Sequence, residues 1–120
     1  MSMRVETKRP SSEDRLDAIL HALSDRTRRK LLKRLARGPA MVGELAKPIA
    51  MTRTAVSKHL RVLEDALLIS RTIDGRVHRC ALRSEPLQEV ERWLTGYRAF
   101  WTEKLDALAR YTEDGDRTHG

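Results

Sequence analysis

The sequence predicts a mainly α-helical domain with one small β-hairpin. Two observations indicate this class. Several segments of the chain repeat apolar residues at the three- and four-residue spacing of an amphipathic helix. In residues 67–82, β-branched side chains lie on both sides of Asp74-Gly75, which is a strong signal for a two-stranded hairpin. We therefore expect the element order α-α-α-α-β-β-α.

Composition excludes several classes of protein. A length of 120 residues suits one small domain, and a hydrophobic content of 40% is enough for one modest core. The single cysteine, Cys80, excludes an internal disulfide framework. The chain has no run of 18 apolar residues that could span a membrane, and residues 1–11 lack the apolar stretch of a signal peptide. We therefore expect a cytoplasmic protein.

Charge is distributed unevenly along the chain. The net charge of +7 favours a polyanionic partner, either nucleic acid or an acidic membrane surface. Residues 1–85 carry 19 basic and 10 acidic side chains, a net charge of +9, whereas residues 86–120 carry 5 and 7, a net charge of −2. The two parts of the chain therefore serve different purposes, and only the first suits a polyanion.

Three short helices are expected before residue 52. Their ranges are residues 13–23, 26–37 and 42–49, each with apolar side chains at helical spacing. Ser12 and Asp25 are suited to cap the first two helices, because their side-chain oxygens can accept from free amides of the first turn.

Thr52 is suited to cap the next helix, because its hydroxyl can accept from a free amide of the first turn. This helix separates an apolar face from a polar and basic face. Val56, Leu60 and Leu63 share the apolar face at positions i, i+4 and i+7. The opposite face carries hydroxyl, ammonium and guanidinium groups, which contact phosphates and base edges of DNA. A tight turn joins the helix after Thr52 to the preceding helix. This arrangement predicts a helix-turn-helix whose second helix enters the major groove. The expected DNA contacts are Thr52, Arg53, Thr54, Ser57, Lys58 and Arg61.

The hairpin that follows this helix is basic. Arg76 and Arg79 lie in it, and Arg71 lies beside them. A basic hairpin directly after a helix-turn-helix is a wing, which can touch the DNA backbone or the minor groove. We therefore expect Arg76 and Arg79 to contact DNA. The alternative is a hairpin that only closes the core.

A last helix is expected over residues 86–112, because proline is accepted in the first turn. Every aromatic residue of the protein lies on this helix, and apolar residues recur along it every seven positions. A helix this long with aromatics on more than one side should pack on a second copy of itself. The alternative is packing within one chain alone. The expected dimer contacts are Leu16, Ile19 and Leu20 of the first helix with Trp93, Leu94, Tyr97, Trp101 and Leu108 of the last.

These elements define the expected organisation of the chain. Residues 1–11 form a flexible N-terminal arm, residues 12–112 form the folded domain, and residues 113–120 form a flexible tail. Within the domain, the helix at about residues 86–112 serves dimerisation.

The sequence carries no set of residues suited to catalysis or metal binding. It has no nucleophile with a base and an orienting group, and no glycine-rich phosphate loop, so we do not expect an enzyme. The histidines His21, His59, His78 and His119 lie in separate segments, whereas zinc needs three or four converging ligands. We therefore expect no metal and no cofactor. His59 should pack behind the recognition helix with a satisfied ring nitrogen, and Cys80 should be a small buried apolar residue.

Three stretches carry a resemblance to a known family: residues 22–32, 44–46 and, above all, 54–66. With the wing at residues 74–76, they resemble the ArsR-type family of bacterial winged helix-turn-helix repressors over about residues 12–112. The third helix has no Cys-x-Cys pair and the last has no histidine, as in a subgroup without the metal sites. The resemblance implies a homodimer, built from the first and last helices, that binds double-stranded DNA at a palindromic operator and represses transcription. It leaves the effector unknown.

Three positions depart from the pattern of the family. Arg26 stands where proline is frequent. Leu67 stands where glycine usually ends the recognition helix in a left-handed conformation, so this helix must end in another way. Met41 replaces the usual Ser or Thr cap, so the third helix is expected to fray. Two other functions stay open: a winged helix that binds a protein partner, and a redox sensor that uses Cys80.

Overall fold

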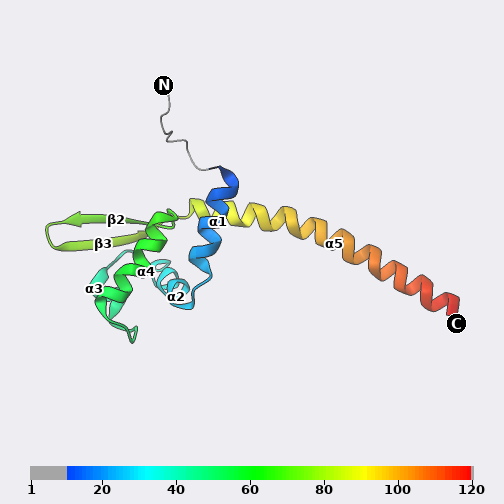
Figure 1. Cartoon of the computed structure of the whole chain (residues 1–120), viewed down its shortest axis with the longest axis horizontal. Coiled ribbons are helices and arrows are strands. Elements are labelled where there is room, and N and C mark those ends of the chain that lie inside the picture. The colour runs from blue at the N-terminus through cyan, green and yellow to red at the C-terminus, as the bar shows by residue number, and fades with distance from the viewer. Residues whose placement is uncertain (1–10, 120) are drawn as a thin grey trace, which may run out of the picture. The chain divides into compact units, whose positions relative to one another are not determined.

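The computed structural model of the chain describes residues 11–119, and the side chains of residues 11–113. It confirms the mainly helical class with a β-hairpin (Figure 1). The expected arm at residues 1–11 lies outside the described residues, apart from Ser11. The elements, in order, are α1 (Ser12–Leu23), α2 (Arg26–Leu35), β1 (Ala40–Met41), α3 (Val42–Ala46), α4 (Arg53–Asp65), β2 (Ile69–Asp74), β3 (Val77–Leu82) and α5 (Glu85–His119).

The chain divides into two compact units. The first ends at Leu87 and contains α1 to β3, and the second begins at Gln88 and contains most of α5. Within residues 11–119, no helix is both long enough and apolar enough to cross a membrane.

The core of the first unit consists of apolar side chains from its helices and its sheet. The predicted apolar faces of α2 and α4 are both buried. The burial of one leucine contributes about 1.5–3 kcal/mol, so these two faces account for much of the stability of the unit. The largest fully buried side chains are Leu31, Leu45, Leu60, Leu63, Leu68, Ile69, Val56 and Cys80.

The three side chains of α1 that were predicted as dimer contacts differ in burial. Ile19 and Ala22 are buried, with exposed fractions of 2% and 0%, whereas Leu20 is 36% exposed. Ile19 therefore packs inside its own chain, and its prediction as a dimer contact is wrong. Leu16 is half-buried and Leu20 is exposed, so these two side chains are accessible on α1.

The sheet has three antiparallel strands in the order β1-β3-β2. Strand β1 was not predicted; it is two residues long and exists through the pairing of Ala40 with Cys80. Strands β2 and β3 form the predicted hairpin, in which Asp74 pairs with Val77. Gly75, the first of the two loop residues, has a φ of +62°, which glycine adopts without steric cost.

The start of each short helix follows its capping residue. Asp25 and Thr52 cap α2 and α4 as predicted, with side chains that accept from the third residue of the helix. The cap of α1 is Ser11 rather than Ser12: its Oγ accepts from the amide of Asp14 at 3.1 Å. One position separates the two serines in sequence, and both are chemically suited to the role.

The C-terminal ends of the helices differ more from the predictions than their N-terminal ends do. Helix α2 ends at Leu35, two residues before the predicted residue 37. Helix α3 ends at Ala46 rather than residue 49, because Pro48 has no amide hydrogen with which to continue it. Helix α5 continues to His119, past the predicted end at residue 112 and through the expected tail. Residues 113–119 contain one glycine and no proline, so they carry no strong stop signal.

The N-terminus of α3 is fixed without a Ser or Thr cap. Met41 offers no side-chain oxygen, but its own amide donates to Glu44 Oε1 at 2.8 Å. This is the carboxylate half of a capping box, and it stabilises the end that was expected to fray.

Helix α4 ends in the motif that usually requires glycine. Leu67 has a φ of +60°. Its amide donates to the carbonyl of Glu64 at 2.9 Å, and the amide of Leu68 donates to the carbonyl of Leu63 at 3.0 Å. These two bonds define a Schellman motif, in which the residue after the cap is left-handed. Leu67 therefore adopts the left-handed conformation that glycine adopts without steric cost. For leucine this conformation is unfavourable, because the residue has a Cβ atom.

We predict that Leu67→Gly stabilises the protein. The left-handed conformation costs a residue with a Cβ atom about 1 kcal/mol, and Leu67 is 51% exposed, so its removal loses little packing. The free energy of unfolding should rise by about 1 kcal/mol and the melting temperature by about 4–8 °C. Thermal unfolding at a fixed protein concentration measures both.

Leu67→Ala is the matched control. It removes the same exposed side chain but keeps the Cβ atom that causes the strain, so it should not stabilise the protein. An equal gain in Leu67→Ala, or a loss in Leu67→Gly, would contradict this explanation.

Candidate nucleic-acid interface

Helices α3 and α4 form a helix-turn-helix (Figure 1). The apolar face of α4 is buried in the first unit, with Val56, Leu60 and Leu63 all at 0% exposure. This burial fixes the rotation of α4 and turns its polar face to the solvent. The predicted DNA contacts Thr52, Arg53, Thr54, Lys58 and Arg61 are exposed, and Ser57 is partly exposed.

Thr52 fixes the start of this helix. Its Oγ1 accepts from the amide of Ala55 at 3.1 Å. The hydroxyl group still has its hydrogen, which can be donated to a phosphate oxygen. Thr52 can therefore cap α4 and contact a DNA backbone at the same time.

The wing presents two exposed arginines. Arg76 is the second loop residue of the hairpin, and Arg79 lies on β3 opposite Thr72 of β2. Cys80, next to Arg79, is fully buried. Alternation along the strand therefore directs Arg79 away from the core.

An open cleft of about 680 Å³ lies between α3, the start of α4 and the wing. Arg53, Ser57 and Arg76 line it, so it joins the predicted contacts of the helix to one of those of the wing. Sequence reasoning missed the remaining charged or titratable residues of its lining, which are Glu44, Lys47, Arg71 and His78.

Arg71 connects the wing to α4. Its Nε lies 3.3 Å from Glu64 Oε1 in an ion pair, although the geometry does not make a well-aligned hydrogen bond. Its Nη1 lies 3.4 Å from His78 Nδ1 on the neighbouring strand. Arginine has only donors, so this His78 nitrogen is the acceptor. The wing is thus held to the recognition helix by a side chain that is largely buried.

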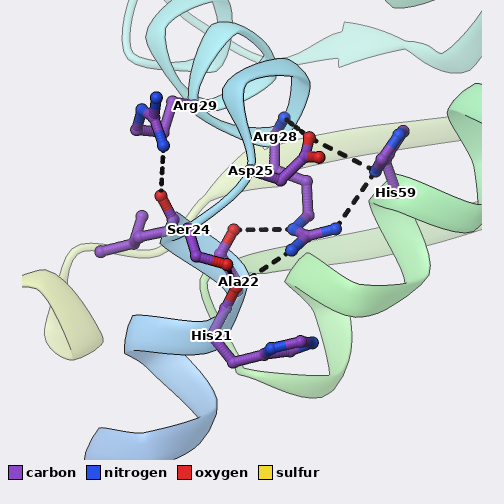
Figure 2. A network of polar contacts seen from close by, with 8 residues as sticks. His21, Ala22, Ser24, Asp25, Arg28, Arg29 and His59 are labelled. Atoms are coloured by element: carbon purple, nitrogen blue, oxygen red, sulfur yellow. Dashed lines mark hydrogen bonds and ion pairs between the residues drawn. The ribbon is translucent and has the colours of Figure 1, made fainter.

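A second arginine, which is buried, connects α4 to the helices behind it (Figure 2). Arg28 of α2 is 8% exposed. Its Nε donates to the carbonyl of Ala22 at 2.7 Å, and its Nη2 donates to the carbonyl of His21 at 3.0 Å. Both carbonyls belong to the last turn of α1, where helix carbonyls lack the usual amide four residues on. The carbonyl of His21 also accepts from the amide and the hydroxyl of Ser24, at 3.1 and 2.6 Å. On its other side, Nη1 lies 3.3 Å from His59 Nδ1 of α4.

His59 therefore packs behind the recognition helix with a ring nitrogen satisfied, as predicted. Because arginine cannot accept, Nδ1 is the acceptor and the proton of the neutral ring is on Nε2. Asp25 Oδ2 lies 3.7 Å from the same Nδ1. The hydrogen bond from the backbone amide of Arg28 is the main cause that lowers the pKa of Asp25; burial opposes it, and the positive charge of the Arg28 guanidinium adds to it.

Comparisons with known proteins agree with this geometry. The family model described as a helix-turn-helix domain matches residues 23–72. The chain is 38% identical over 103 residues to the HTH-type transcriptional regulator Rv2034 of Mycobacterium tuberculosis, across 85% of this chain and 94% of the relative. It is 29% identical over 82 residues to the transcriptional repressor SdpR of Bacillus subtilis, across 68% of this chain and 91% of the relative.

Solved structures give the same result. The ArsR family transcriptional regulator RHA00566 shares 44% sequence identity at a TM-score of 0.72, across 75% of this chain and 93% of that one. An ArsR-like transcriptional regulator from Rhodococcus sp. RHA1 shares 30% identity at a TM-score of 0.69, across 81% and 92%. The chain belongs to the ArsR family. It is a winged helix-turn-helix protein and a DNA-binding transcriptional regulator.

Two features of this ArsR-family regulator concern metal and redox chemistry. In the part of the chain that the structure describes, no three His, Cys, Asp or Glu side chains are close enough to hold a metal ion. Cys80 is fully buried, and this burial raises the pKa of its thiol. The thiolate is the reactive form, so the position favours the predicted role as a small apolar residue over a redox sensor.

We predict that Arg28→Ala destabilises the regulator by about 2 kcal/mol or more, because a buried acceptor without a partner costs about 1–3 kcal/mol. The carbonyl of Ala22 would lose the Nε that donates to it, and His59 Nδ1 would lose its neighbour. Urea denaturation measures the change in the free energy of unfolding.

Arg29→Ala is the control, since Arg29 is the next residue of α2 and also caps α1. Its Nη1 donates to the carbonyl of Leu23 at 2.8 Å, but this bond is exposed and water can replace it. The loss should stay below about 1 kcal/mol. Equal losses of unfolding free energy in the two variants would show that burial of Arg28 does not increase the contribution of its hydrogen bonds to stability.

Proposed function

We propose that this regulator is a homodimeric repressor that binds a palindromic operator and reads it through α4. The observation that carries the proposal is the exposed hydroxyl and basic face of α4, at the rim of a cleft shared with the wing. The relative SdpR is named as a transcriptional repressor, which supports repression as the outcome. Because such an operator lies on the chromosome, we place the regulator in the cytoplasm.

Roles can be assigned along the helix. The N-terminal residues of a recognition helix enter the major groove first, so we assign Arg53, Thr54 and Ser57 to base edges. Lys58 and Arg61 lie further along the exposed face, and we assign them to phosphates together with Thr52. Arg76 and Arg79 of the wing would hold the DNA backbone beside the helix. The proposal includes no metal, because the sequence lacks the Cys and His ligands of the metal sensors in this family.

Arg53→Ala and Lys58→Ala test these roles. The probe is the DNA duplex that the wild-type protein selects from a randomised library, with a scrambled duplex as comparison. Arg53→Ala should cost about 1–3 kcal/mol on the selected duplex and relax the preference at one base pair. Lys58→Ala should weaken both duplexes by the same factor, since phosphates are present in every sequence. Fluorescence anisotropy gives the affinities, and unchanged affinity in both variants would disprove the assignment.

The proposed dimer rests on the apolar surface of α5. Trp93 and Tyr97 stack with ring centroids 5.2 Å apart, Tyr97 and Trp101 are 5.9 Å apart, and Phe100 and Trp101 are 6.0 Å apart. These rings form a continuous aromatic row, and each side chain in it is 39–50% exposed in the single chain. A row of this size on an isolated chain is typical of an interaction site. Leu94 and Leu108 extend the apolar surface of α5. Leu16 and Leu20 offer a separate apolar strip on α1.

A second copy of the chain is the partner that fits this surface. A two-fold axis would place the same row on both sides of the interface, so that each aromatic row meets its equivalent. The same axis would set two recognition helices about 34 Å apart, which is one turn of duplex, and would require a palindromic operator. Ile19 takes no part in this interface, because it is buried in its own chain.

Trp101→Glu tests the dimer. A buried Trp contributes a few kcal/mol at about 25 cal/mol per Å², and a buried carboxylate without a partner is costly. We expect the variant to sediment at 13.8 kDa at micromolar concentration and to lose tight binding to the selected duplex, with all DNA contacts intact. Thr102→Glu adds the same charge at the neighbouring exposed position and should stay dimeric. A wild type that itself sediments as a monomer would end the proposal.

A further inference from the structure

The guanidinium of Arg53 lies against the backbone of α3 at Gly43. Its Nη2 is 2.7 Å, and its Cζ 3.7 Å, from the position that a Cβ atom at residue 43 would occupy. A real Cβ atom does not tolerate a neighbour at 2.7 Å. Arg53 therefore occupies space that exists only because residue 43 has no side chain.

The backbone does not explain a glycine at this position. Gly43 is in α3 and its φ lies outside the left-handed region, so any residue could adopt its conformation. Inside a helix, glycine is less favourable than alanine because it has more conformational freedom to lose on folding. The contact with Arg53 is the one feature of the site that depends on the missing side chain.

This contact matters because Arg53 is the first residue of α4, in the cleft between α3 and the wing. A free arginine side chain has many rotamers, and ordering it on binding costs free energy. Recognition of guanine also requires the planar guanidinium in one orientation, since both of its hydrogen bonds form in the plane of the base. A glycine at residue 43 leaves open the placement of the guanidinium in the cleft, which a Cβ atom there would close.

We propose that Gly43 is a positioning residue for base recognition: the space above its Cα atom admits the guanidinium of Arg53 in the cleft, in a placement that a side chain at residue 43 would exclude. The inference rests on the proposed function, in which Arg53 reads a base edge. It assigns to α3 a part in sequence specificity, although α3 itself carries none of the proposed base contacts.

Gly43→Ala tests the proposal on the duplex that the wild type selects from a randomised library. The added methyl group displaces the guanidinium but favours the helix, so the melting temperature should stay the same or rise. The affinity for the selected duplex should fall by about 5- to 100-fold, the range of one lost base contact. Preference should relax only at the base pair whose preference also relaxes in Arg53→Ala. A purely structural role of Gly43 would not change preference at a single base pair.

The double variant Gly43→Ala with Arg53→Ala is the matched control. Without the guanidinium, the methyl group meets nothing, so Gly43→Ala should change the affinity of Arg53→Ala by less than about 2-fold. An equal loss in both backgrounds would overturn the proposal, as would wild-type or increased affinity in Gly43→Ala. If Arg53→Ala alone leaves affinity and preference unchanged, the proposed function of Arg53 is wrong instead.

Discussion

The buried guanidinium of Arg28 connects the recognition helix to the two helices behind it. Arg28 of α2 donates to the carbonyls of His21 and Ala22 at the end of α1. The same guanidinium contacts His59 on the rear of α4. One cation therefore joins three helices, and the exposed face of α4 is directed outward by what lies behind it. A charge this buried is tolerated because its nitrogens have acceptors on both sides.

Helix α4 could be predicted because its signals lie in residues that are close together in the sequence. An N-cap needs only the residue before the helix, and an apolar face needs only its spacing, so Thr52 and the buried row of α4 followed from the sequence. The burial of Arg28 could also have been found. It lies three and four residues before Leu31 and Leu32, on the buried face of α2, but arginine is rarely buried, so the residue type alone argues against burial.

Features that depend on distant residues could not be found in this way. Core and interface positions share the same apolar composition, so spacing alone could not show that Ile19 is covered by its own chain while Leu20 is not. Strand β1 has two residues, too few to show the alternation of apolar and polar residues that predicts a strand, and it exists only through its pairing with β3. Arg71 and His78 enter the cleft because the hairpin folds back beside α3 and α4. The sequence indicated which surface is basic, but not how its side chains converge.

The ion pair between Arg71 and Glu64 affects how the regulator responds to ionic strength. Each phosphate that a protein cation neutralises releases a counterion from DNA, and this release sets the slope of affinity against salt concentration. Arg71 is already paired inside the protein at 3.3 Å and largely buried, so it displaces no ion when DNA binds. In the proposed DNA complex, the number of basic residues in the wing therefore overstates its electrostatic contribution, and Arg71 instead connects the wing to α4.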